Sequence, residues 1–242
     1  MTYCVGLLLN EGMVLLSDTR TNAGLDNIST YRKMFTFEEP GERVIAIMTA
    51  GSLSVTQTTI ARLREAMEDA DADGETSIMK APTVLKVAEI VGNMLADVST
   101  EIGEKMSAQK QSASATMIVA GQRKGGAMRL FLIYPEGNFI EASWDTPFFQ
   151  IGETKYGRPI LIRGYDRGMS FEDAVKLLMV SFDSTIKANL SVGLPLDLLV
   201  IGKDAFAATH EHRVTADDPY FATISSGWGD ALRSAFHSLP PY

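Results

Sequence analysis

The first part of the chain consists of short apolar runs separated by turn residues. Apolar runs over residues 2–9 and 13–17 flank the turn sequence Asn-Glu-Gly at 10–12, a pattern that is typical of a β-hairpin. A nearly continuous apolar run over residues 43–50 ends at Gly51 and indicates a buried strand. The chain is therefore expected to begin with a strand-rich segment.

Apolar residues recur at helical spacing in later segments. The first of these begins at Ser52, with Ser52 or Ser54 as the candidate N-cap, and the second begins at Pro82. A third helix is expected over residues 170–189, and a short helix is expected over residues 228–237. The helices therefore stand in blocks and do not alternate with single strands.

Strands return after the second helix and again after the third. They are expected at residues 115–120, 128–134, 139–144, 148–151, 196–201 and 210–214. Runs of antiparallel strands with helices gathered in blocks favour an α+β layered architecture over alternating βαβ units. No composition shift marks a linker, so we expect one domain over residues 1–242.

Composition and charge exclude several classes of protein. The 242 residues include 22 Lys and Arg against 30 Asp and Glu, and the net charge of −8 argues against a nucleic-acid-binding surface. A single cysteine cannot form an internal disulfide, and no apolar run approaches the roughly 18 residues of a membrane span. A secretory signal would carry a basic residue before its apolar stretch, but none precedes the apolar residues 5–9. A cytoplasmic location is therefore expected.

The acidic segment after the first predicted helix resembles half of a calcium-binding loop. Asp69, Asp71 and Asp73 match the first acidic positions of an EF-hand loop, and Gly74 matches its glycine. The last position of such a loop must supply a bidentate glutamate, but here it is Lys80. We therefore interpret the segment as a solvated loop between two helices.

Other candidate motifs have simpler structural interpretations. His210 and His212 share one face of a predicted strand and could form half of a metal site, but only His237 is left to complete it. A strand end at the surface is the preferred interpretation. Cys4 lies in an apolar strand and is interpreted as a small buried residue, not a thiol nucleophile. The Gly-Gly turn at 125–126 lacks the spacing of a phosphate-binding loop, and no metal or cofactor is expected.

Thr2 directly follows the initiator methionine, and small residues at this position commonly allow Met1 to be removed. Removal would leave a threonine whose hydroxyl and free α-amine belong to the same residue. An α-amine titrates near ~7.7–8.0 and can act as a general base near neutral pH. A hydroxyl activated by its own N-terminal amine is an established nucleophile. Taken alone, a threonine here is more often an ordinary strand residue.

Further motifs give Thr2 a context. After Thr2-Tyr3 come Ser17-Asp18-Thr19-Arg20, Ala23-Gly24, Tyr31-Arg32-Lys33-Met34-Phe35 and Thr49-Ala50-Gly51-Ser52. In this order and spacing the motifs resemble the proteasome β-type subunits. The resemblance is strongest to the bacterial Anbu (ancestral beta subunit) branch, with the ATPase-partnered HslV peptidases as relatives. Weaker similarity continues to about residue 201.

The resemblance implies an N-terminal-nucleophile (Ntn) hydrolase. The fold that it implies is a four-layer αββα sandwich, in which two antiparallel sheets lie between helical layers. The resemblance also implies peptide-bond hydrolysis through an acyl-enzyme on Thr2. Lys33 would place a cation beside the Thr2 hydroxyl and amine, and Asp18 would hold and balance Lys33. The backbone N–H of Gly51 would donate to the oxyanion, and a glycine there would leave room for the substrate.

The same resemblance assigns a substrate pocket. Thr21 and Thr49, together with Tyr31 and Leu53, fall where the family shapes the pocket for the residue before the scissile bond. Asn22 stands where many β subunits carry a threonine that bonds the substrate backbone. These positions are therefore expected to line the substrate site.

The sequence departs from the family around the nucleophile. Glu153 follows Gly152 at a position where the family has serine. Ser191 matches the serine of a distal Asp…Ser pair, but the aspartate has no counterpart, and Ala188 stands three residues earlier. The network that supports Thr2 is therefore expected to differ from the family's, with consequences for rate and substrate preference.

Three functions remain open at this point. The first is a threonine peptidase that self-associates into a ring or helical homo-oligomer and cleaves peptides or unfolded proteins. An ATPase partner is neither indicated nor excluded by the sequence. The second is an Ntn-fold assembly subunit with little or no peptidase activity, and the third is an amidase acting on a small peptide-like metabolite. Nucleic acid and membrane are not expected as partners.

Overall fold

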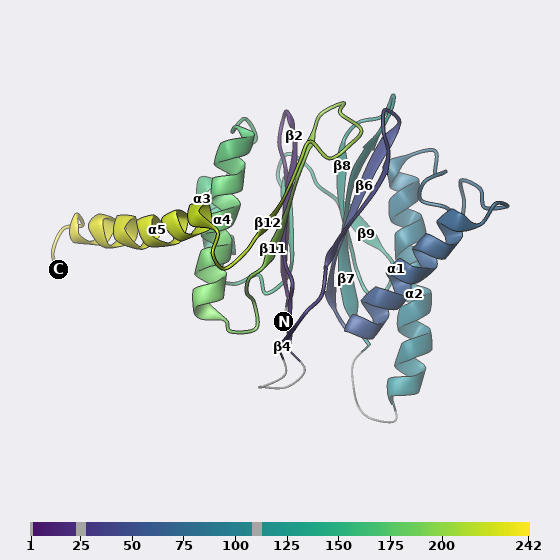
Figure 1. Ribbon diagram of the computed structural model, residues 1–242, viewed down its shortest axis with the longest axis horizontal. Helices are drawn as coiled ribbons and strands as arrows, with labels where there is room; N and C mark the ends of the chain where they lie inside the picture. The colour runs from purple at the N-terminus through teal and green to yellow at the C-terminus, as the bar shows by residue number, and fades with distance from the viewer. Residues whose placement is uncertain (1, 23–27, 108–112) are drawn as a thin grey trace.

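The computed structural model describes residues 2–22, 28–107 and 113–242, which form a stack of four layers (Figure 1). Two antiparallel sheets lie face to face, and each is covered on its outer side by helices. The predicted αββα sandwich is thus confirmed. Met1 and the Ala23-Gly24 part of the sequence motif lie outside the described residues.

Each sheet is assembled from distant parts of the chain. The first has the spatial order β10 (Phe148–Gly152), β1 (Tyr3–Leu8), β2 (Gly12–Asp18), β11 (Leu196–Gly202) and β12 (His210–Val214). The second has the order β5 (Met34–Glu39), β6 (Arg43–Gly51), β7 (Ala115–Arg123), β8 (Arg129–Ile133) and β9 (Phe139–Glu141). A small hairpin pairs β3 (Arg20–Asn22) with β4 (Ile28–Thr30).

Helices cover the two outer faces. The second sheet is covered by α1 (Leu53–Glu68) and α2 (Val84–Ser107), and the first by α3 (Arg158–Gly164) and α4 (Phe171–Ala188). The last helix, α5 (Pro219–His237), projects away from this body (Figure 1). None of the helices in the described ranges combines the length and apolar character that a bilayer crossing needs.

Burial on both faces explains why the central strands are almost wholly apolar. In β1, Tyr3 and Val5 point into the core beneath the helices, whereas Cys4 points into the core between the sheets. In β6, Ile47 faces the helices and Met48 faces the other sheet. Both faces of these strands are buried, so their apolar runs are continuous. The prediction that Cys4 is a small buried residue is confirmed.

The structure adds elements that the apolar pattern did not predict. The short strands β3 and β4, the mixed strand β5 and the helix α3 carry too few periodic residues to be detected. Helix α5 begins at Pro219, earlier than predicted, because polar residues and two glycines dilute its apolar stripe. Ser52 occupies the N-cap of α1, but its hydroxyl contacts the Ser54 hydroxyl at 3.1 Å and makes no capping bond.

Candidate active site

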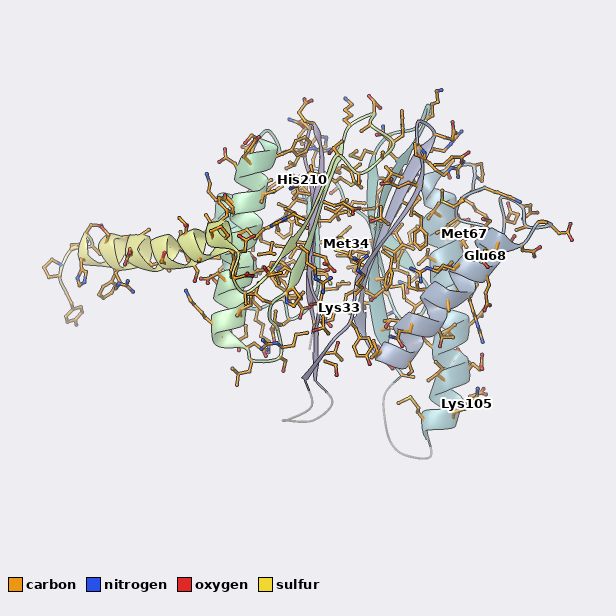
Figure 2. All side chains as sticks on the ribbon, in the orientation of Figure 1. Lys33, Met34, Met67, Glu68, Lys105 and His210 are labelled. Carbon is orange, nitrogen blue, oxygen red and sulfur yellow. The ribbon has the colours of Figure 1, made fainter. Side chains whose placement is uncertain are left out.

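A cavity of about 430 Å³ lies where β1 begins and β6 ends. It is lined by Thr2, Thr21, Arg32, Lys33, Thr49, Ala50, Gly51, Leu53, Thr56 and Gly152. Figure 2 shows Lys33 between the two sheets, toward the end of the sandwich where the chain begins. The cavity brings together six of the site residues that the sequence predicted, from segments far apart in the chain.

The backbone of Thr2 is held by the end of β10. The N–H of Glu153 donates to the Thr2 carbonyl oxygen at 2.6 Å. This approach requires glycine at position 152, because Gly152 has a φ of +85° and a Cβ there would lie 1.9 Å from the Thr2 carbonyl oxygen. Gly152 therefore allows two backbones to meet directly beside the candidate nucleophile.

Tyr3 anchors the strand that follows Thr2. Its hydroxyl lies 2.8 Å from Ser181 Oγ and accepts a hydrogen bond from Gln150 Nε2 at 2.6 Å. Its ring packs on Phe182, with centroids 4.4 Å apart. Burial raises the pKa of Tyr3 to about 12, so the hydroxyl stays neutral at physiological pH. The start of β1 is thus tied to both α4 and β10.

Lys33 and Asp18 form a buried ion pair at this cavity. Lys33 Nζ lies 2.8 Å from Asp18 Oδ1 and also donates to the carbonyl oxygen of Arg20. Burial raises the pKa of the Asp18 carboxyl, while the Lys33 ammonium and the backbone N–H groups of Tyr3 and Gly193 oppose that rise. Because Asp18 does not line the cavity, it can act on a ligand only through Lys33.

Gly51 ends β6 next to the N-terminus of α1. Its φ of +112° lies in the region that favours glycine. A Cβ at this position would lie 2.5 Å from the Ser114 carbonyl oxygen and 2.7 Å from Ala115 Cα. The structure therefore gives a different reason for this glycine from the predicted room for substrate. The chain that enters β7 leaves no space for a side chain.

The rest of the predicted pocket is only partly assembled. Tyr31 is 39% exposed and does not line the cavity, where Arg32 stands instead. Asn22 ends β3, and its side chain lies outside the described part of the structure. Arg32 and Thr56 are lining residues that the sequence reasoning missed. Arg32 belongs to the motif at residues 31–35 but was given no role there, and the only signal for Thr56 is its place in the first turn of α1.

Glu153 supplies a carboxylate to the loop in which the sequence lacks an aspartate. Glu153 is buried, and its Oε2 accepts a hydrogen bond from Asn189 Nδ2 at 3.0 Å. Asn189 Oδ1 in turn accepts the N–H of Ser191 at 2.9 Å. The same loop contains Gly193, whose N–H contacts Asp18. Ser191 does not line the cavity, so the loop reaches the candidate site through Asp18.

Replacing Glu153 with alanine is expected to lower the free energy of unfolding by about 2 kcal/mol, because a buried hydrogen bond to a charged group is lost. Unfolding in guanidinium chloride at neutral pH measures the change. Glu68→Ala, at the exposed end of α1, is the control and should stay within about 0.5 kcal/mol of the wild type. Equal losses in the two variants would show that the Glu153–Asn189 contact does not stabilise the fold.

The remaining motifs lie apart from this cavity. The rings of His210 and His212 stack with centroids 6.3 Å apart, and His212 Nε2 lies 2.8 Å from Asp218. Residues 69–83 connect α1 to α2, and Lys80 Nζ donates to a backbone carbonyl of that connection. Within the described ranges, no group of three or more His, Cys, Asp and Glu side chains is placed to hold a metal ion.

Comparisons with known proteins point to one family. Residues 2–201 match the proteasome subunit family. Anbu (ancestral beta-subunit) from Yersinia bercovieri is 40% identical with a TM-score of 0.92, over 99% of this chain and 98% of that chain. The Anbu (Gly-1) mutant from Hyphomicrobium sp. strain MC1 is 44% identical with a TM-score of 0.93, over 100% and 99%. The Anbu complex from Pseudomonas aeruginosa, described as a helical assembly, is 42% identical with a TM-score of 0.92, over 99% and 98%. No curated protein matches the chain.

Proposed function

Because the chain belongs to the proteasome subunit family, whose fold is that of the Ntn hydrolases, we propose that it is a threonine peptidase with Thr2 as its nucleophile. The observation that carries this proposal is one cavity lined by Thr2, Lys33 and Gly51, with Asp18 paired to Lys33 beside it. The hydroxyl can act as a nucleophile and the backbone N–H as an oxyanion donor, while the buried cation would favour the deprotonated forms of the hydroxyl and of the α-amine that serves as base.

The proposed reaction begins once Met1 is removed and the Thr2 α-amine is free. The amine accepts the hydroxyl proton while Oγ attacks the carbonyl carbon of the peptide bond. The tetrahedral intermediate collapses to an ester on Oγ, and the proton passes to the departing amine. A water molecule, giving its proton to the same α-amine, then hydrolyses the ester and restores the threonine hydroxyl.

Three surrounding groups assist these steps in the proposed mechanism. The Lys33 ammonium favours the deprotonated amine and the developing alkoxide of Thr2 by its positive charge. Asp18 keeps that ammonium in place, since an unpaired buried cation is costly. Gly51 offers its backbone N–H to the oxyanion at the N-terminal end of α1, where the helix dipole favours negative charge.

A second candidate function has its own observation. Glu153 stands where the family has serine, and its carboxylate contacts Asn189 in the loop where the family's aspartate has no counterpart. If this network does not support the Thr2 hydroxyl as the family's network does, turnover of ordinary peptides would be slow. In that case the chain would serve chiefly as an assembly subunit with the Ntn fold, or as an amidase on a small peptide-like metabolite.

We also propose that the chain self-associates, as the helical assembly described for the Pseudomonas aeruginosa Anbu complex suggests. Helix α5 supports this proposal because it projects from the body with exposed apolar side chains (Figure 1). These side chains are Leu232 and Phe236, and the exposed Leu239 follows just after the end of the helix.

The mass of the purified chain tests the proposed nucleophile directly. We expect the mass to fall by one methionine residue relative to the printed sequence, because an exposed Thr2 amine is required for catalysis. A threonine-directed covalent inhibitor should then add one adduct, located on Thr2 by peptide mapping. A chain that retains Met1 and remains unlabelled would contradict the peptidase proposal and favour the assembly subunit.

A further inference from the structure

A second cavity, of about 640 Å³, opens along one edge of the sandwich. Strands β5 and β12 are each an edge strand of their sheet, and both contribute to its walls. Figure 2 places Met34, one of the wall residues, between the sheets directly after Lys33. The walls are formed by Arg32, Met34, Phe35, Thr36, Arg64, Asp197, Leu198, Leu199, Glu211, His212 and Arg213. We call this cavity the edge cleft.

The edge cleft collects arginines in a chain whose net charge is −8. Arg213 donates to Asp197 Oδ1 at 3.0 Å, so its guanidinium is already engaged. Arg64 stacks its guanidinium over the Phe35 ring at 5.4 Å, and Arg32 acts on Asp197 only through its charge. Within the described residues, neither Arg32 nor Arg64 has a hydrogen-bond or ion-pair partner among the side chains.

The acidic groups of the edge cleft do not pair with Arg32 or Arg64, so both guanidinium groups are available to a ligand. The carboxyl of Asp197 is engaged by Arg213, and burial raises its pKa despite the nearby arginines. Glu211 adds one negative charge from β12, and His212 is paired with Asp218 on the way to α5. Two arginines without acidic partners therefore face one glutamate, so the cleft has an excess of guanidinium groups.

Arg32 also lines the cavity that contains Thr2. The two cavities therefore share one side chain, and under the proposal below an extended ligand in the first cavity would continue past Arg32 into the second. A guanidinium binds a carboxylate with two parallel hydrogen bonds, and its planar fork is well suited to that partner. The apolar Met34 and Leu199 would contact the methylene groups of a glutamate or aspartate side chain.

We propose that the edge cleft binds an acidic segment of the peptide substrate, with Arg32 and Arg64 pairing with its carboxylates. This inference rests on the proposed peptidase function, because it is the nucleophile cavity that makes the ligand a peptide. It names a substrate class that the family resemblance does not supply. Peptides rich in Glu or Asp beyond the scissile bond would be preferred over neutral or basic ones.

Binding to a variant that cannot turn over the substrate tests the proposal. In a Thr2→Ala background, a fluorescein-labelled peptide with a run of Glu should bind about tenfold more tightly than the same peptide with Gln. Adding Arg64→Gln should remove most of this preference, and raising the salt concentration should reduce it. Arg233→Gln, on exposed α5, is the matched control and should leave the preference unchanged.

The outcomes separate the edge cleft from the peptidase proposal. Equal binding of the Glu and Gln peptides, or an equal loss in the Arg64 and Arg233 variants, would overturn the edge-cleft assignment. Displacement of the peptide by an equal concentration of free glutarate would also overturn it, because the cleft would then be a site for small dicarboxylates. Tight binding of the Glu peptide by a wild-type chain that hydrolyses no peptide would contradict the peptidase proposal alone.

Discussion

Replacing Thr2 with alanine is expected to lower the rate of peptide hydrolysis by about 10⁴-fold or more, because the variant lacks the oxygen that forms the acyl-enzyme. The backbone contact between Thr2 and Glu153 involves only main-chain atoms, so the fold should be unaffected. Steady-state hydrolysis of a set of fluorogenic peptides, with circular dichroism to verify folding, measures the effect.

Thr2→Ser is the matched control for this substitution. Serine and alanine are both small enough to permit removal of Met1, so the two variants differ only in the presence of the hydroxyl. Serine should retain measurable hydrolysis and covalent labelling. Hydrolysis by the alanine variant at the wild-type rate would show that Thr2 is not the nucleophile and that the cavity performs different chemistry.

Lys33→Met is expected to slow hydrolysis strongly and to destabilise the fold. The activity should fall about 10³-fold, because no cation remains to favour the deprotonated amine of Thr2. The free energy of unfolding should fall by about 3–5 kcal/mol near neutral pH, because the buried Asp18 carboxylate loses its partner. Peptide hydrolysis and unfolding in guanidinium chloride report the two effects separately.

The loss of stability in this variant should depend on pH. Burial already raises the pKa of Asp18, and without Lys33 the main opposing interaction is gone. A carboxyl whose pKa is higher in the folded state than in the unfolded state binds more protons when folded, so stability falls as the pH rises through that interval. The Lys33→Met variant should therefore be less stable near neutral pH than near pH 4.

The double variant Lys33→Met/Asp18→Asn tests whether the unpaired Asp18 charge or the altered packing around position 33 causes the loss of stability. With no carboxylate left to ionise, the double variant should recover most of the stability lost near neutral pH and lose its dependence on pH. It should remain inactive, because the cation is still absent. A double variant as unstable as Lys33→Met would show that the ion pair is not the cause of the loss.

The layered fold could be predicted because its strands and helices carry local signals. The hairpin of β1 and β2 and the buried strand β6 were visible as apolar runs, since both faces of each strand are covered. Strands β3 and β4 were not visible, because three residues are too few to show a period. The start of α5 was placed too late, since its glycines and polar residues weaken the apolar stripe that marks a helix.

The amino-acid sequence by itself determined the family, the order of the layers and the residues Thr2, Lys33 and Gly51 that share one cavity. Local periodicity gave the strands and helices, whereas the family, the order of the layers and the site residues followed from short motifs that resemble those of the proteasome β-type subunits. Only the tertiary structure decided that Glu153 contacts Asn189, thirty-six positions away, and that Arg32 joins two cavities. It also decided that Gly51 is required by the chain entering β7. Such contacts join segments that are distant in the chain, so their energies depend on packing that no local pattern records.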